Sequence, residues 1–361
     1  MPTASSAPPA APPRCLVFPL IPTPFRLPHQ ECPPTHQECR LSLSGEFGAP
    51  SGGRGRRAEP GRAVSEHRAA GAATLGAVPS NAVLLLSCPD RRGIVAAVAD
   101  FVARHGGNIV SAEQHTDPPS GVFFQRVEFE LGAFDVDRDE ILGAFEPVRA
   151  RFEMAASLRF TDRRTRVAIL ASRQPHCLYD LLSRWHTDEL PMELAVVVSN
   201  HPDHAETCAF FGVDYVHLPV TPETKPTQEA AVLQVLAERE VELVVLARYM
   251  QILSAGFVGR YPDRVINIHH SFLPAFVGAR PYHQAHERGV KIIGVTAHYA
   301  TASLDEGPII EQDVVRVSHR DAPEDLVRKG RDLEVVVLAR AMRAQLEHRV
   351  LVFGRKTVVF E

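Results

Sequence analysis

Three side chains of this 361-residue chain have the types and spacing of a site that polarises a carbonyl group: Asn267, His269 and Asp305. Asn267 and His269 lie two residues apart at the end of the apolar run 265–268, so their side chains share one face of an expected strand. An amide N–H of Asn267 can stabilise a developing oxyanion. His269 can add a second donor or transfer a proton near neutral pH. The carboxylate of Asp305, in a loop after a second apolar run, could orient His269 and accept a proton from water.

Each of these positions also has a simpler interpretation. Polar groups at a strand end can cap a loop, and an aspartate in a tight loop is commonly an Asx turn. His298, in the apolar run before Asp305, could be a core histidine or a polar group behind the site, and the second is favoured. Glu306 is expected to be solvated. His270 is expected to point to the opposite side from His269 and to serve packing.

Short apolar runs separated by amphipathic stretches must position these residues. The runs predict strands at 167–170, 194–198, 243–246 and 265–268, and the stretches between them predict helices at 177–184, 203–211 and 227–238. Near-continuous apolar strands that alternate with helices are typical of a parallel sheet covered on both faces. Ligands bind beyond the carboxyl ends of such strands. The chain is expected to end with a helix over 323–347 and two short strands near Val350 and Val358.

An earlier segment has a different pattern. Strands are predicted at 82–88, 108–114, 122–131 and 154–160, and helices at 93–105 and 140–152. This βαββαβ order is that of a ferredoxin-like unit. The fold class is therefore α/β, with a ferredoxin-like domain over 81–160, a linker over 161–165, and a Rossmann-like, mostly parallel domain over 166–361.

Residues 1–80 differ from everything that follows. They hold fourteen of the 29 prolines and a run rich in glycine and arginine at 51–57. A segment without apolar periodicity cannot offset its ordering entropy, so we expect it to be disordered. A transit peptide is a weaker alternative. A further alternative is that the native protein begins near Val78.

Composition excludes several classes of function. The net charge of −4 and a pI near 6.5 give no basis for binding nucleic acid or an anionic membrane, and no apolar run is long enough to span a bilayer. Six cysteines without a CxxC pair are typical of reduced thiols in a cytoplasmic protein. A zinc site is not expected in the Pro-rich surroundings of the tail residues that could form one, His29, Cys32, His36 and Cys39.

The segment 267–313, NIHHSFLPAFVGARPYHQAHERGVKIIGVTAHYATASLDEGPIIEQD, resembles the catalytic core of the formyltetrahydrofolate-dependent formyltransferase family. Four further strings fit the water-using member of that family: SNHPDH at 199–204, LPVTPETK at 218–225, LARYMQILS at 246–254 and KTVVF at 356–360. The resemblance covers 81–361. It implies hydrolysis of 10-formyltetrahydrofolate to tetrahydrofolate and formate, which would supply formate for purine biosynthesis and balance the one-carbon folate pools. The folate is then a substrate, and no cofactor and no metal are expected.

The resemblance also implies roles for individual residues. The catalytic set of the family falls on Asn267, His269 and Asp305. The folate pocket of the family falls on the segment after the expected strand 243–246 and on the loop before Asp305. Its residues would be Arg248, Tyr249, Met250, Gln251, Ile252, Leu253 and Leu304.

The N-terminal unit resembles an ACT domain, a type of domain that pairs through its sheets and binds amino acids at the pair interface. The resemblance implies a homo-oligomer (a dimer or a tetramer) and an amino-acid effector such as glycine or methionine. The effector residues would be Asp90, Gly93, Ile94, Asn108 and Ile109. From local chemistry alone, Asp90 would be expected to cap a helix and Gly107 to end one.

Three other functions compete with hydrolysis of the folate. A formyltransferase for a nucleotide-linked amine would need a glycine-rich phosphate cradle after the first strand, and the turn 172–176 has no glycine and contains Pro175. An amino-acid sensor with an inactive second domain is disfavoured by the complete Asn, His and Asp set. A metal-dependent hydrolase is disfavoured because the 17 histidines include no HExxH spacing.

Overall fold

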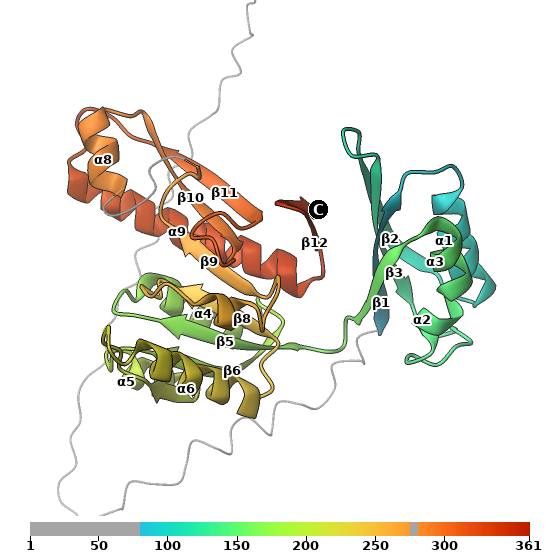
Figure 1. Cartoon of the computed structure of the whole chain (residues 1–361), viewed down its shortest axis with the longest axis horizontal. Coiled ribbons are helices and arrows are strands. Elements are labelled where there is room, and N and C mark those ends of the chain that lie inside the picture. The colour runs from blue at the N-terminus through green and yellow to red at the C-terminus, as the bar shows by residue number, and fades with distance from the viewer. Residues whose placement is uncertain (1–79, 275–280) are drawn as a thin grey trace, which may run out of the picture. The chain divides into compact units, whose positions relative to one another are not determined.

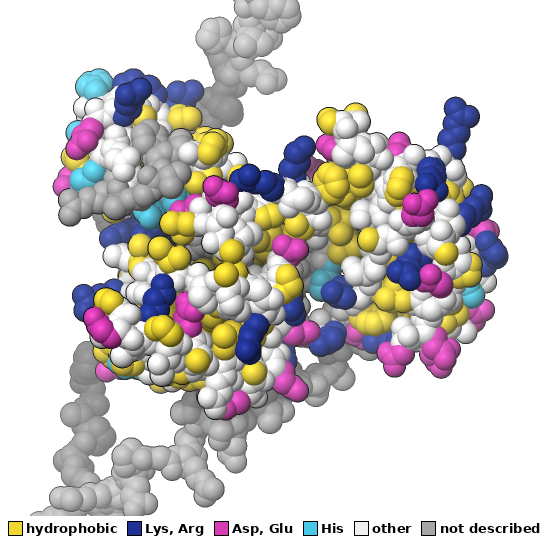
Figure 2. Space-filling model, in the orientation of Figure 1, with side chains coloured by type: hydrophobic (Ala, Val, Ile, Leu, Met, Phe, Trp, Pro, Cys, Tyr) yellow, Lys and Arg dark blue, Asp and Glu magenta, His cyan; other side chains and the backbone are white. Residues whose placement is uncertain are grey.

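The structure is a computed structural model, and it describes residues 80–274 and 281–361 (Figure 1). The predictions for the tail, apart from Ser80, lie outside the described residues. Within the two described ranges, no helix combines the length and the apolar character that crossing a membrane requires. On the face drawn in Figure 2, the basic and acidic side chains of the described residues are interspersed.

The first part of the described chain is an antiparallel sheet with helices on one face. Its elements are β1 Asn81–Pro89, α1 Ile94–Arg104, β2 Ile109–Asp117, β3 Val122–Glu130, α2 Ile141–Ala144, α3 Glu146–Phe152 and β4 Ala155–Phe160. The strand order is β2-β3-β1-β4, which confirms the predicted ferredoxin-like class. β1 is apolar on both faces because α1 and α3 pack on one face and the C-terminal hairpin packs on the other.

The single helix predicted over 140–152 is instead two, α2 and α3, which meet at Phe145. Pro147 lies in the first turn of α3. Proline has no N–H to donate to the carbonyl of Gly143, so the helical hydrogen-bond ladder is interrupted and starts again. The apolar periodicity continues across this break, which is why the sequence predicted one helix.

The second part is a seven-stranded sheet covered on both faces (Figure 1). Its elements are β5 Thr165–Ala171, α4 His176–His186, β6 Met192–Ser199, α5 Ala205–Phe210, β7 Tyr215–His217, α6 Lys225–Glu238, β8 Leu243–Ala247, α7 Ala255–Val258, β9 Val265–His269, α8 Pro281–Arg288, β10 Ile292–Tyr299, β11 Ile309–Arg316 and α9 Pro323–Leu346. Helices α4, α5 and α9 cover one face, and α6 and α7 cover the other. The two strands predicted at the C-terminal end are β12 Val350–Phe353 and β13 Lys356–Val359.

The strand order is β11-β10-β9-β8-β5-β6-β7. Strands β5 to β9 are parallel, and β10 and β11 are antiparallel to their neighbours. This confirms the Rossmann-like, mostly parallel class. The chain proceeds from β5 to β6 on one side and returns to β8 on the other, so the carboxyl ends of β5 and β8 mark the switch point at which such sheets bind ligands.

The sequence did not predict β7, β11, α7 or α8. β11 has the sequence IIEQDVVR, and it lies at the edge of the sheet with alternating partial exposure. Its polar residues interrupt the apolar run by which the inner strands were identified. The other three elements are short, with at most eight residues, which leaves few positions from which a periodic pattern can be recognised.

Candidate active site

All ten residues predicted for catalysis and folate binding line one cavity of about 240 Å³. It opens at the ends of β8 and β9, and the loop after β10 closes one side. The two segments that supply its polar groups come together because β9 and β10 are paired, with Asn267 opposite His298. The cavity therefore combines a polar floor with an apolar rim, as small-molecule sites commonly do.

Asn267 is oriented by His298. The Nδ1–H of His298 donates to the carbonyl oxygen of Tyr299 at 2.9 Å, so Nε2 of the neutral ring is an acceptor. The amide nitrogen of Asn267 lies 3.2 Å from that Nε2 and donates to it. Burial lowers the pKa of His298, which keeps the ring neutral. One amide N–H of Asn267 is used in this bond, and the second is available for a carbonyl oxygen in the cavity.

His269 lies between a carboxylate and a hydroxyl. Its Nδ1 is 3.3 Å from Oδ1 of Asp305, and its Nε2 is 2.8 Å from Oγ of Ser271. A hydroxyl both donates and accepts, so Ser271 can partner Nε2 in either protonation state of the ring. The geometry thus suits a histidine that takes up a proton and returns it.

The order Ser271, His269, Asp305 is also that of a nucleophilic triad. Ser271 is only 4% exposed and does not line the cavity described above. A buried hydroxyl outside the cavity cannot reach a carbonyl carbon bound within it. Ser271 is therefore a support for the ring of His269, and the sequence did not indicate it because its role depends on the turn after β9.

Asp305 remains ionised in this environment. The hydrogen bond with His269 lowers the pKa of its carboxyl, and this outweighs the burial that would raise it. Nε2 of the neutral His298 ring lies 3.7 Å from the same carboxylate. Asp305 has φ 55°, a left-handed conformation that is uncommon outside glycine but tolerated by aspartate. A carboxyl with a low pKa is a weak base, so its contribution is a fixed negative charge beside His269.

Gly307 allows the loop that carries Asp305 to close against β10. A Cβ at this position would lie 1.7 Å from the carbonyl oxygen of Tyr299. Gly307→Ala should therefore lower the free energy of unfolding by about 1–3 kcal/mol, since the backbone must move. Chemical denaturation checks this, with Gly256→Ala as the control because its added Cβ would have only one neighbour, at 3.8 Å. Equal stability of the two variants would contradict the close approach.

The apolar rim comes from the segment after β8 and from the loop after β10. Met250, Ile252 and Leu304 are 57%, 59% and 55% exposed, which is high for large apolar side chains around one cavity. The segment is held by its backbone, because the N–H of Met250 donates to Oγ of Ser172 at 3.1 Å. Exposed apolar side chains on an anchored backbone are suited to hold a flat, partly apolar ligand.

Tyr249 lines the cavity, but its ring is buried in the core formed with α6 and α7. Its hydroxyl accepts a hydrogen bond from Nε2 of Gln228 at 2.9 Å. The side chain of Tyr249 is therefore a core residue that fixes the turn, and Gln251, two positions later, is only partly buried. The resemblance implied a place for Tyr249 in the folate pocket, and the structure adds the packing of its ring in the core.

His270 lines the same cavity as His269, which differs from the packing role expected for it. β9 ends at His269, so the alternation of side chains does not extend to His270. Its Nδ1 lies 2.7 Å from a guanidinium nitrogen of Arg248. Burial, and then the positive charge of Arg248, lower the pKa of His270 to about 4.

His270 should make the protein less stable as the pH falls from 6.5 to about 4. The folded pKa lies below the unfolded pKa, so the unfolded state binds the proton first and the free energy of unfolding decreases through this window. The whole change for one such group is at most about 3.4 kcal/mol. Denaturation of the wild type and of His270→Gln at pH 7 and pH 5 measures it. The variant should lose less stability on acidification, and an equal loss would contradict the assignment.

The five residues predicted to bind an effector do not meet within one chain. Asp90, Gly93 and Ile94 follow the end of β1, where β1 pairs with the start of β3. Asn108 and Ile109 lie at the start of β2, beside the end of β3. The two groups are separated by the length of a nine-residue antiparallel strand, about 27 Å for eight steps of about 3.4 Å.

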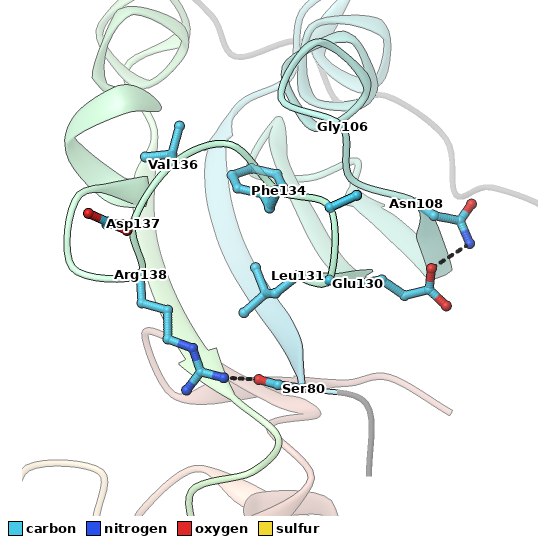
Figure 3. A pocket seen from close by; sticks show the side chains of 11 residues that line it. Ser80, Gly106, Asn108, Glu130, Leu131, Phe134, Val136, Asp137 and Arg138 are labelled. Atoms are coloured by element: carbon cyan, nitrogen blue, oxygen red, sulfur yellow. Dashed lines mark hydrogen bonds between the residues drawn. The ribbon is translucent and has the colours of Figure 1, made fainter. Parts of the chain in front are cut away.

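A cavity of about 590 Å³ lies at the second of these ends (Figure 3). Asn108 donates to Glu130 on one side of it, and Arg138 donates to Ser80 on the other. Its larger apolar residues are Leu131, Phe134 and Val136. Of the five predicted effector residues, only Asn108 lines this cavity.

Comparisons with known proteins agree with this architecture. The formyl transferase family model matches residues 165–342, and the ACT domain model matches residues 82–145. The chain is 56% identical over 279 residues to the formyltetrahydrofolate deformylase of Synechocystis sp., which covers 77% of this chain and 98% of that protein.

Two solved structures extend the comparison. The formyltetrahydrofolate deformylase of Pseudomonas syringae pv. tomato superposes with a TM-score of 0.77 at 50% identity, covering 80% of this chain and 96% of that chain. Glycinamide ribonucleotide transformylase 1 of Symbiobacterium toebii superposes with a TM-score of 0.53 at 34% identity, covering 57% of this chain and 98% of that chain.

Proposed function

The chain belongs to the formyltetrahydrofolate deformylase family, and on that premise we propose that it hydrolyses 10-formyltetrahydrofolate to tetrahydrofolate and formate at Asn267, His269 and Asp305. It is accordingly an enzyme, a hydrolase that acts on the C–N bond of a formamide. The observation that carries the residue assignment is that these three side chains, from β9 and from the loop after β10, meet in one cavity with an apolar rim.

The reaction requires one water molecule. The formyl oxygen accepts a hydrogen bond from the free N–H of Asn267. The water oxygen attacks the formyl carbon while Nε2 of His269 takes up its proton, the water replacing Oγ of Ser271 as the partner of that nitrogen. Asp305 stays ionised and stabilises the imidazolium through Nδ1, at 3.3 Å in the free enzyme. The proton then passes from His269 to N10 of the folate and the C–N bond breaks, which gives tetrahydrofolate and formic acid. The acid loses its remaining proton to solvent and leaves as formate.

The structure favours His269 over Asp305 as the proton acceptor. Asp305 has a lowered pKa and is a weak base, whereas His269 has Ser271 as a partner in both protonation states. These side chains supply the oxyanion donor, the base and the fixed charge. We therefore propose that no metal and no cofactor take part, and activity should persist after treatment with a chelator.

A formate-release assay with purified protein and 10-formyltetrahydrofolate, without a second substrate, tests this function. Formate and tetrahydrofolate should appear in equal amounts. Turnover only after addition of an amine, with formation of the formylated amine in place of formate, would instead support the alternative, a formyltransferase. The glycine-free turn between β5 and α4 favours water as the acceptor.

We further propose that the ACT domain pairs with a second copy and binds an amino acid. β2 is an edge strand among the described residues, and Val110 on it is 54% exposed. Antiparallel pairing of two β2 edges would bring Asn108 of one chain toward the Asp90 end of the other. The two groups of predicted effector residues, which lie far apart within one chain, would then meet across the pair and form a site that both chains share.

Calorimetry with glycine and with methionine tests the effector. Heat of binding with one of them, together with a change in the rate of formate release, would support it. Sedimentation tests for the dimer or tetramer. A monomer, or the absence of any heat, would contradict the corresponding proposal.

We place the enzyme in the cytoplasm, where its formate would serve purine biosynthesis and its turnover would balance the one-carbon folate pools. Cys88, Cys177 and Cys208 are buried free thiols, a state typical of a reducing compartment. Fractionation of cells, followed by detection of the protein and of formate release, tests the location.

A further inference from the structure

A carboxylate is buried in α9, close to the candidate active site. Glu334 is 1% exposed, and an unpaired charge at such a position would be strongly unfavourable. Three side chains offset that cost. Nε2 of His176 lies 2.7 Å from Oε2 of Glu334, the hydroxyl of Tyr282 donates to Oε1 at 3.0 Å, and Nε of Arg248 lies 3.4 Å from Oε2.

The helix is adapted to this arrangement. Gly330 lies one turn before Glu334 in the interior of α9, where glycine destabilises a helix relative to alanine. A Cβ on Gly330 would lie 2.1 Å from the hydroxyl oxygen of Tyr282. The missing side chain therefore makes room for Tyr282 to reach Glu334.

Arg248 links this carboxylate to the folate rim. It is the first residue after β8, its φ is 59°, and its N–H donates to the carbonyl of Leu246 at 3.1 Å. A non-glycine residue keeps a left-handed conformation only where its surroundings hold it there. The side chain of Arg248 is mostly buried and reaches Glu334, while the backbone leaves in the direction of Met250 and Ile252.

Arg248 also determines the state of His270. An arginine can only donate, so Nδ1 of His270, 2.7 Å away, must be the acceptor and the proton of the neutral ring lies on Nε2. His270 follows the catalytic His269 and lines the same cavity. Through Arg248, the ion pair with Glu334 is thus connected to the backbone segment that carries Met250 and to His270, which lines the cavity.

A metal site at this place is disfavoured by charge. His176, Cys177 and Glu334 have ligand atoms within 4.8 Å of one another. Burial raises the pKa of the Cys177 thiol well above its ordinary value, so it is not a thiolate. Glu334 already faces the guanidinium of Arg248, with which a cation would compete.

We propose that Glu334 is a positioning residue: through Arg248 it holds the turn that presents the folate rim and fixes the tautomer of His270. Glu334 ties together the ends of three strands, since His176 follows β5, Arg248 follows β8 and His270 follows β9. This inference rests on the proposed function, because the rim is identified as the folate wall.

Glu334→Gln tests the proposal. Glutamine has the size of glutamate and keeps one acceptor oxygen, but its NH₂ group would face the donors of Tyr282 and Arg248 and could not accept from them. The KM for 10-formyltetrahydrofolate should rise at least about tenfold, with a smaller change in kcat. The affinity for tetrahydrofolate, measured by calorimetry, should fall by a similar factor. Tyr282→Phe is the matched control: it removes one hydrogen bond to the same carboxylate and should lower the melting temperature but leave KM and affinity unchanged.

A second variant separates positioning from stability. Removal of both charges in Arg248→Met/Glu334→Met should restore much of the melting temperature lost in Glu334→Gln, since breaking a buried pair costs more than replacing it. Its KM and its affinity for tetrahydrofolate should nevertheless remain weak. If Glu334→Gln does not fold, this double variant decides the question.

Two outcomes would overturn the inference: a wild-type KM in Glu334→Gln, or recovery of KM together with stability in the double variant. Failure of the proposed function has a different signature. In that case the wild type itself would release no formate, whereas failure of the positioning role requires an active wild type.

Discussion

Replacement of Asp305 by asparagine should lower kcat for formate release by about 10²–10⁴-fold, the range for loss of general acid–base help. The amide has the shape of the carboxylate but no charge, so the imidazolium of His269 loses its partner at 3.3 Å. The hydrogen bond from His269 lowers the pKa of Asp305, which shows that the ionised form is the one this site favours. His269→Ala should cause a loss of the same order, because the two residues act as one unit.

The neighbouring acid provides a matched control for this experiment. Glu306 is one position further along the same loop, and its carboxylate lies 3.4 Å from the guanidinium of Arg355 on the exposed surface. Glu306→Gln makes the same chemical change and should leave kcat within about twofold, since exposed ion pairs contribute little. Near-normal kcat in Asp305→Asn, or an equal loss in Glu306→Gln, would refute the role of Asp305.

Asn267→Ala should lower kcat by about 10²–10³-fold with little change in KM. In the proposed mechanism, the N–H of Asn267 that is not bonded to His298 donates to the formyl oxygen, and this bond strengthens as the oxygen becomes an oxyanion. An interaction made mainly in the transition state affects kcat and not KM. Steady-state kinetics of formate release measure both constants.

Asn267→Asp makes the test more selective. Aspartate keeps the size of asparagine, but an ionised carboxylate cannot donate a hydrogen bond. It should therefore be at least as inactive as Asn267→Ala. An active Asn267→Asp variant would show that the amide donor is not required.

Much of the fold could be predicted from local patterns. The inner strands β5, β6, β8 and β9 are near-continuous apolar runs because both of their faces are covered. The edge strand β11 escaped prediction because only part of it is covered. The break between α2 and α3 at Phe145 was not predicted, because the spacing of apolar residues carries no information about the missing N–H of Pro147.

The same distinction applies to the site. Asn267, His269 and Asp305 have types and positions that indicate carbonyl chemistry within a short stretch of chain. The contributions of Ser271, His270 and His298 depend on which atoms face them across β9, β10 and the turn after β9. Periodicity and residue type do not specify such pairings.

The sequence alone determined the α/β class, the two kinds of sheet and the polar residues at the strand ends, because periodicity and residue type are properties of neighbouring positions. Only the tertiary structure decided that Glu334 meets Arg248, 86 positions earlier in the chain, and that the predicted effector residues lie at opposite ends of one sheet. These relations arise from strand order and helix packing. A buried charge is tolerated only where the packed fold brings its partner to it.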